Sequence, residues 1–96
     1  MQKSNQQTLK EAIAEFLKVM KLDTKLKEVK LITSWETIVG KLIAKHTKDI
    51  SIRNKVLYVT LDSAALRQEL GYAQEKILQM LNDSAGEKLI EKVVFK

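Results

Sequence analysis

Five cations and one tyrosine near the middle of the chain are the residues best suited to contact another molecule. They are Lys41, Lys45, Lys48, Arg53, Lys55 and Tyr58. Ammonium and guanidinium groups bind phosphate oxygens, and an exposed aromatic ring among them can stack on an unpaired base. The alternative for Tyr58 is an ordinary strand-forming residue on a solvated sheet face. We predict that these six residues contact nucleic acid.

The charge of the chain is unevenly distributed along it. The 96 residues carry 17 Lys and Arg against 12 Asp and Glu, a formal charge of +5. Residues 1–55 hold 12 basic and 6 acidic side chains, whereas residues 56–96 hold 5 basic and 6 acidic ones. A one-sided basic surface favours a polyanionic partner, although lysines also solvate helix faces without binding anything. The excess of lysine over arginine suits phosphate contact better than the reading of base edges.

Residue types that build other kinds of site are scarce. There is no cysteine and only one histidine, His46, which excludes disulfides, thiolate metal sites and His-rich zinc sites. Three dispersed glycines form neither a phosphate-binding loop nor the Gly-x-x-Gly clamp of KH modules. Ser63 beside Asp62 is predicted to cap a helix rather than to act as a nucleophile. We expect no catalytic residue, metal, cofactor or small-molecule substrate.

The hydrophobic pattern contains no membrane or export signal. No run approaches the roughly 20 apolar residues of a membrane span. The opening residues lead into a helix pattern that contains lysine and glutamate, which is not typical of a signal peptide. We expect a cytoplasmic protein without a membrane partner.

Two helical segments precede most of the candidate contact residues. Residues 1–22 form an amphipathic helix, predicted from apolar residues at three- and four-residue steps: Leu9, Ile13, Phe16, Leu17 and Met20. The spacing leaves open whether this helix packs on the sheet or projects as a partner-binding arm. A second helical period extends to about Lys45, with a break near Ser34. Trp35 within it is a predicted core anchor, and the alternative is a stacking platform.

The pattern then changes to a period of two, which predicts a β-hairpin around a turn at residues 53–55. A helix is predicted from Ser63 to about Asn82, and Gly71 inside it indicates either a close neighbour or a bend. A turn over residues 82–86 and a final strand over residues 89–95 complete the chain. The prediction is one α+β domain over residues 1–96, ordered α-α-β-β-α-β, with a three-stranded sheet packed on helices on one face.

Two blocks of the sequence resemble a known family. Residues 35–47 read WETIVGKLIAKHT, which is similar to the W-x-x-I-V-G-x-x-I-A-x-H-T signature of the DciA family. Residues 57–70 resemble its L-x-V-x-V-x-S-S-x-W-x-x-E-L block, with Leu66 where a tryptophan is frequent. Asn82, Gly86 and the closing strand match the end of the family pattern, so the resemblance extends from about residue 9 to residue 95.

This resemblance implies a KH-like domain with a role in bacterial DNA replication. Proteins of the DciA family bind DNA and assist the loading of the replicative hexameric helicase. It therefore implies a DNA-binding adaptor whose partners are single-stranded or duplex DNA and the replicative helicase. The alternative is a protein-interaction module that docks on an acidic partner without touching nucleic acid.

Overall fold

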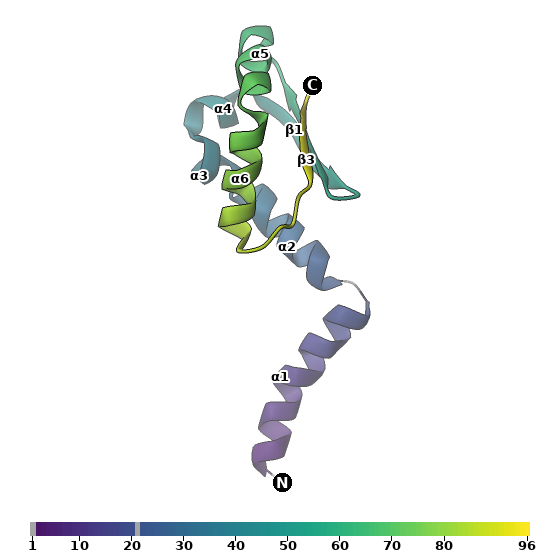
Figure 1. Ribbon diagram of the computed structural model, residues 1–96. Helices are drawn as coiled ribbons and strands as arrows, with labels where there is room; N and C mark the ends of the chain where they lie inside the picture. The colour runs from purple at the N-terminus through teal and green to yellow at the C-terminus, as the bar shows by residue number, and fades with distance from the viewer. Residues whose placement is uncertain (1, 21) are drawn as a thin grey trace.

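The computed structural model describes residues 2–20 and 22–96, apart from the side chains of residues 2–7 and 17. Helices and strands follow one another in this part of the chain as Figure 1 shows: α1 (Gln2–Val19), α2 (Leu22–Thr33), α3 (Trp35–Val39), α4 (Lys41–Lys45), β1 (Thr47–Arg53), β2 (Val56–Leu61), α5 (Ala64–Tyr72), α6 (Gln74–Ala85) and β3 (Lys92–Phe95).

The three strands form one sheet in the order β1-β2-β3. β1 and β2 are antiparallel, and β3 lies parallel to β2 after the crossover through α5 and α6. Figure 1 shows α3 and α6 on one side of the sheet, while no described helix covers the opposite side. The predicted α+β class, with helices on one face of a three-stranded sheet, is confirmed.

The core lies between this sheet and the helices. Alternate residues of β2 are buried, and Leu57 and Val59 have no exposed surface. Leu81 of α6 is equally buried on the helical side. Trp35 is only 4% exposed and belongs to the same cluster. The prediction of Trp35 as a core anchor is confirmed, and the alternative of a stacking platform is wrong because the ring is enclosed.

Both long predicted helical segments are interrupted, the first forming three helices and the second forming two. The second helical period breaks near Ser34 as predicted, and again at Gly40, whose φ of 95° favours glycine. The helix predicted from Ser63 is interrupted at Ala73, between α5 and α6. A Cβ atom on Gly71 would meet nothing within 4 Å, so of the two explanations for this glycine the close neighbour is wrong.

The C-terminal boundaries differ from the sequence prediction at the end of α6 and at the start of β3. The predicted turn over residues 82–86 is helical as far as Ala85, and the strand begins at Lys92 instead of Leu89. Asn82 Oδ1 accepts hydrogen bonds from the amides of Leu89 and Ile90, both at 2.9 Å, and its Nδ2 donates to the carbonyl of Ile90 at 2.9 Å. These backbone groups therefore bond to α6 rather than to a strand.

The N-terminal helix projects from the rest of the molecule. It was predicted over residues 1–22 and is observed as α1, Gln2–Val19, while Leu22 already begins α2 and residues 1 and 21 lie outside the described part. Figure 1 shows α1 extending away from the sheet, in a molecule of 61 × 24 × 21 Å. Of the two arrangements that the sequence left open, the structure has the projecting arm.

Candidate nucleic-acid interface

The hairpin turn brings a lysine to the tip of the sheet. Asn54 and Lys55 close the turn between Arg53 and Val56 with φ values of 52° and 65°. Two consecutive left-handed residues are typical of the primed turns that match strand twist. Asparagine tolerates this conformation, whereas lysine adopts it at a cost of about 1 kcal/mol. The side chain of Lys55 is exposed at the end of the hairpin.

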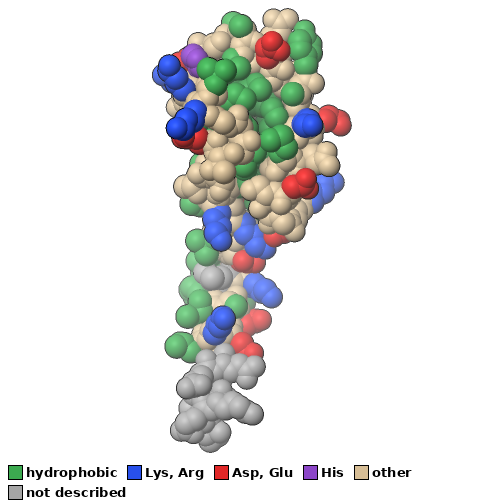
Figure 2. All heavy atoms as spheres, turned by 90° about the vertical axis from the view of Figure 1, so that its left-hand side faces the viewer, with side chains coloured by type: hydrophobic (Ala, Val, Ile, Leu, Met, Phe, Trp, Pro, Cys, Tyr) green, Lys and Arg blue, Asp and Glu red, His purple; other side chains and the backbone are tan. Residues whose placement is uncertain are grey.

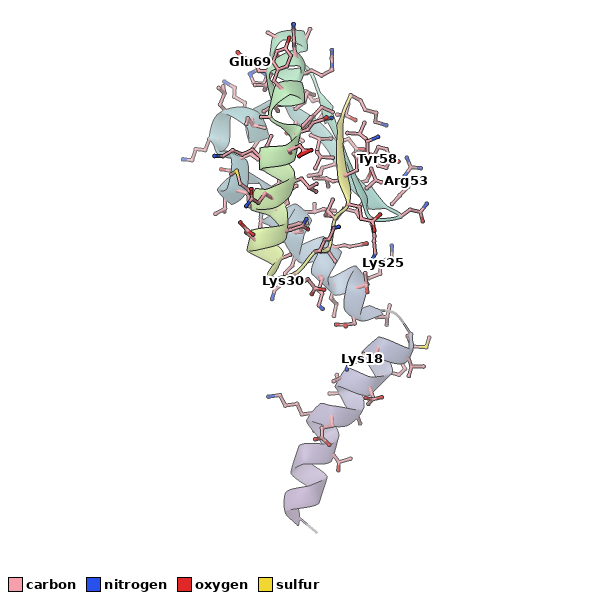
Figure 3. All side chains as sticks on the ribbon, viewed as in Figure 1. Lys18, Lys25, Lys30, Arg53, Tyr58 and Glu69 are labelled. Carbon is pink, nitrogen blue, oxygen red and sulfur yellow. The ribbon has the colours of Figure 1, made fainter. Side chains whose placement is uncertain are left out.

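The helix-free face of the sheet has Tyr58 near its centre. Tyr58 lies on β2 between Ser51 of β1 and Val94 of β3. The guanidinium carbon of Arg53 lies 4.9 Å from the centre of its ring, and the Nζ of Lys96 lies 5.4 Å from it. Figure 3 shows Arg53 and Tyr58 next to each other on the side of the sheet away from α6. We call Arg53, Tyr58 and Lys96 the sheet-face cluster.

A second group of cations lies where α4 meets β1. Lys41 and Lys45 of α4 are exposed, and among the described residues neither has an ion pair. Lys48 at the start of β1 places its Nζ 3.3 Å from Asp62 Oδ2, so its charge is partly neutralised. Figure 2 shows lysine or arginine side chains beside the single histidine on this side of the molecule. We call Lys41, Lys45 and Lys48 the α4 group.

The carboxylate of Asp62 joins this group to the end of β2. It accepts a hydrogen bond from the Nδ1 of His46 at 2.7 Å. That bond lowers the pKa of Asp62 below its usual value, and Lys48 acts in the same direction against a partial desolvation that raises it. Asp62 therefore stays ionised and holds Lys48 in an ion pair.

The six predicted contact residues do not form one cluster. Lys48 and Arg53 are five positions apart along β1, which corresponds to roughly 17 Å. Lys41, Lys45 and Lys48 thus lie at one end of the hairpin, and Arg53 and Lys55 at the other with Tyr58 nearby. Sequence reasoning missed Lys96, because its place beside Tyr58 depends on the parallel register of β3 against β2.

The described residues form neither a metal site nor a membrane-spanning helix. Across residues 2–20 and 22–96, no three His, Cys, Asp or Glu side chains lie where they would bind a metal ion together. No described helix has the length and apolar character to span a bilayer. The hydroxyl of Ser63 accepts a hydrogen bond from the amide of Leu66 at 3.2 Å, which confirms the predicted helix cap.

Comparison with known proteins decides the family. The family model described as "Dna[CI] antecedent, DciA" matches residues 8–95. The chain belongs to the DciA family. A curated relative, the UPF0232 protein of Corynebacterium glutamicum (strain R), is 38% identical over 58 residues, which are 60% of this chain and 33% of the relative. The chain thus matches about a third of the length of that relative.

Residues of the DciA signature connect α3, α4 and β1 through hydrogen bonds. Trp35 Nε1 donates a hydrogen bond to Thr47 Oγ1 at 3.0 Å, and Thr47 Oγ1 donates to the carbonyl of Ile43 at 2.8 Å. These bonds tie α3 and α4 to the start of β1, and Gly40 supplies the left-handed backbone between the two helices. The DciA signature therefore accounts for the fold of this region, and of the candidate contact residues only the α4 group lies on its exposed edge.

Proposed function

We propose that this DciA-family chain is a non-enzymatic adaptor with a KH-like domain that binds DNA and assists the loading of the replicative helicase. Membership of the family supports the link with DNA replication and the helicase. The observation that carries the proposal for DNA is the sheet-face cluster, in which two cations lie against one tyrosine ring on a face that no described helix covers. We propose this face as the contact for single-stranded DNA.

The chemistry of the sheet-face cluster suits a single strand. A base stacked on an aromatic ring gains about 1–3 kcal/mol, and cations beside the ring attract the adjoining phosphates. The nearest side chains on the same face, apart from the two cations, are those of Val56, Thr60, Ser51 and Val94, which are small and uncharged. A flat base can therefore approach the ring once Arg53 and Lys96 turn toward phosphate.

The α4 group supplies further phosphate contacts in this proposal. Lys41 and Lys45 are exposed, so their charges attract a polyanion directly. Lys48 is exposed as well, but its ion pair with Asp62 must weaken before its charge is available to phosphate. We expect Lys41 and Lys45 to contribute more to affinity than Lys48 does.

Fluorescence anisotropy with labelled single-stranded and duplex oligonucleotides, at two salt concentrations, tests the proposal. Tyr58→Ala is expected to weaken single-strand binding about tenfold without changing its salt dependence, because it removes stacking and no charge. Arg53→Gln is expected to reduce the salt slope by about one unit, as the loss of one phosphate contact does. Lys76→Gln on α6 is the control with the same charge change away from the sheet face.

Two results decide between this proposal and a module that binds only protein. Absence of any anisotropy change at low salt would remove the DNA contact. Capture of the purified replicative helicase that persists after nuclease treatment, together with that absence, would support the protein-interaction alternative. Binding that Lys76→Gln weakens as much as Arg53→Gln does would show diffuse attraction rather than a site on the sheet.

A further inference from the structure

α1, together with Met20 directly after its last residue, exposes a row of large apolar side chains. Leu9 is 67% exposed, Ile13 54%, Phe16 58% and Met20 55%. Figure 2 shows hydrophobic side chains along one edge of the projecting helix, with charged side chains beside them. Contiguous apolar surface of this kind is rare on a monomer and marks an interaction site. We call these four residues the α1 row.

The spacing of the α1 row is palindromic. Its members follow one another at steps of four, three and four residues, the alternation of a two-helix seam. A second α1 laid antiparallel against the first therefore places Leu9 opposite the partner's Met20 and Ile13 opposite the partner's Phe16. Each of the four layers then contains two large apolar side chains, related by a two-fold axis.

We propose that α1 binds α1 of a second copy of this chain as an antiparallel helix pair. The direction follows from the shape of the molecule, since α1 joins the compact part at one end and antiparallel pairing keeps the two compact parts at opposite ends. The charges agree with it. Glu15 and Lys18 lie outside the seam, and the two Lys10 side chains that flank it are offset by about 13 Å along the axis.

The size of the surface sets the strength of the pairing. The apolar surface on each copy consists of four side chains that are more than half exposed and of Val19, which is 74% exposed. A standard specific interface buries about 800 Å² and about 20–30 residues on each partner, so a contact through one helix is smaller than that standard. We expect a reversible dimer with a dissociation constant in the micromolar range.

Sedimentation equilibrium of the full chain, from low micromolar to several hundred micromolar, tests the pairing. The wild type is expected to change from the mass of one chain to that of two. Phe16→Glu is expected to remain monomeric, because it buries a charge in a central layer. Ala14→Glu adds the same charge outside the seam and is expected to dimerise like the wild type. Emission from the buried Trp35 verifies that each variant is folded.

Disulfide cross-linking tests the direction, since the chain has no cysteine of its own. A mixture of Leu9→Cys and Met20→Cys is expected to form heterodimers on oxidation. Leu9→Cys alone is not expected to cross-link, because antiparallel pairing separates the two copies of residue 9 by about 17 Å, beyond the roughly 7 Å that a disulfide spans.

Three outcomes would overturn the pairing. A wild type that stays monomeric over the whole range excludes it and leaves another protein as the occupant of the α1 row. A Phe16→Glu variant that dimerises like the wild type places the contact elsewhere on the molecule. Cross-linking of Leu9→Cys alone, without heterodimers in the mixture, replaces the antiparallel arrangement with a parallel one.

Discussion

The two faces of the sheet are made from alternate residues of the same strands. On β2, Leu57 and Val59 point to the helices and have no exposed surface, whereas Tyr58 between them points to the helix-free face. The first face is filled by side chains of the helices. The second has a ring with two cations and small uncharged neighbours. One face therefore stabilises the fold, and the other is available for binding.

This difference shows that composition alone does not identify a binding surface. Tyrosine and leucine both favour burial or half-burial in a strand, and the period of two merely assigns them to opposite faces. The position of the helices decides which of those faces meets solvent. Substitutions on neighbouring residues of β2 should therefore have separate effects on stability and on binding.

The largest expected effect is on stability, where Leu57→Ala should be much more damaging than Tyr58→Ala. Leu57→Ala removes a fully buried side chain and should lower the free energy of unfolding by about 3 kcal/mol. Tyr58→Ala should lower it by less than about 1 kcal/mol, because its ring is not enclosed. Urea denaturation followed by Trp35 emission measures both. Equal losses in the two variants would mean that the sheet faces are not distinct.

A substitution at the hairpin tip, Lys55→Gly, is expected to change stability less and in the opposite direction. Lys55 adopts a φ of 65°, which glycine adopts without strain. Lys55→Gly should raise the free energy of unfolding by about 1 kcal/mol, while loss of the cation weakens oligonucleotide binding and reduces the salt slope. Thermal denaturation and anisotropy on the same preparation measure the two changes. Lys76→Gly is not a suitable control, because glycine within α6 would itself destabilise the helix. Lys76→Gln is therefore the control for the loss of one positive charge in the binding measurement.

A Lys55→Gly variant that is destabilised would show that the lysine side chain contributes contacts outweighing its backbone strain. A variant that is stabilised but binds unchanged would remove Lys55 from the contact surface and leave Arg53, Lys96 and the α4 group.

Much of the fold was predictable because it depends on residues close in sequence. The helical spacing, the break at Ser34, the hairpin turn and the cap at Ser63 each follow from a few neighbouring side chains. The break at Gly40 was missed although a glycine stands there, because the apolar period continues through it. The start of β3 was misplaced because Asn82 bonds to residues seven and eight positions later.

The candidate site was less predictable, since it depends on contacts between elements. The sequence indicated Arg53 and Tyr58 together because they belong to one hairpin. It could not place Lys96 beside them without the register of β3, nor pair Lys48 with Asp62 across β1 and the end of β2. The apolar spacing of α1 resembles that of a buried helix, and spacing alone does not say whether anything covers it.

The smallest expected effect concerns Asp62, at the end of β2 opposite the hairpin tip. Its pKa is lowered in the folded chain, first by the hydrogen bond from His46 and then by Lys48. Since the folded value lies below the unfolded value of about 3.8, the ionised carboxylate stabilises the fold above that pH. This contribution is lost as the pH falls through the folded pKa.

Asp62→Asn removes the titration while keeping the shape of the side chain. The difference in free energy of unfolding between wild type and Asp62→Asn should be constant at pH values just above the unfolded pKa and shrink as the pH falls below about 4. Urea denaturation at a series of acidic pH values measures it, with Asp83→Asn on the exposed side of α6 as the control. At neutral pH the same variant frees Lys48 from its ion pair, so oligonucleotide binding should become slightly tighter. Unchanged binding together with the predicted acid dependence would remove Lys48 from the proposed DNA contact and leave the sheet-face cluster, Lys55, Lys41 and Lys45.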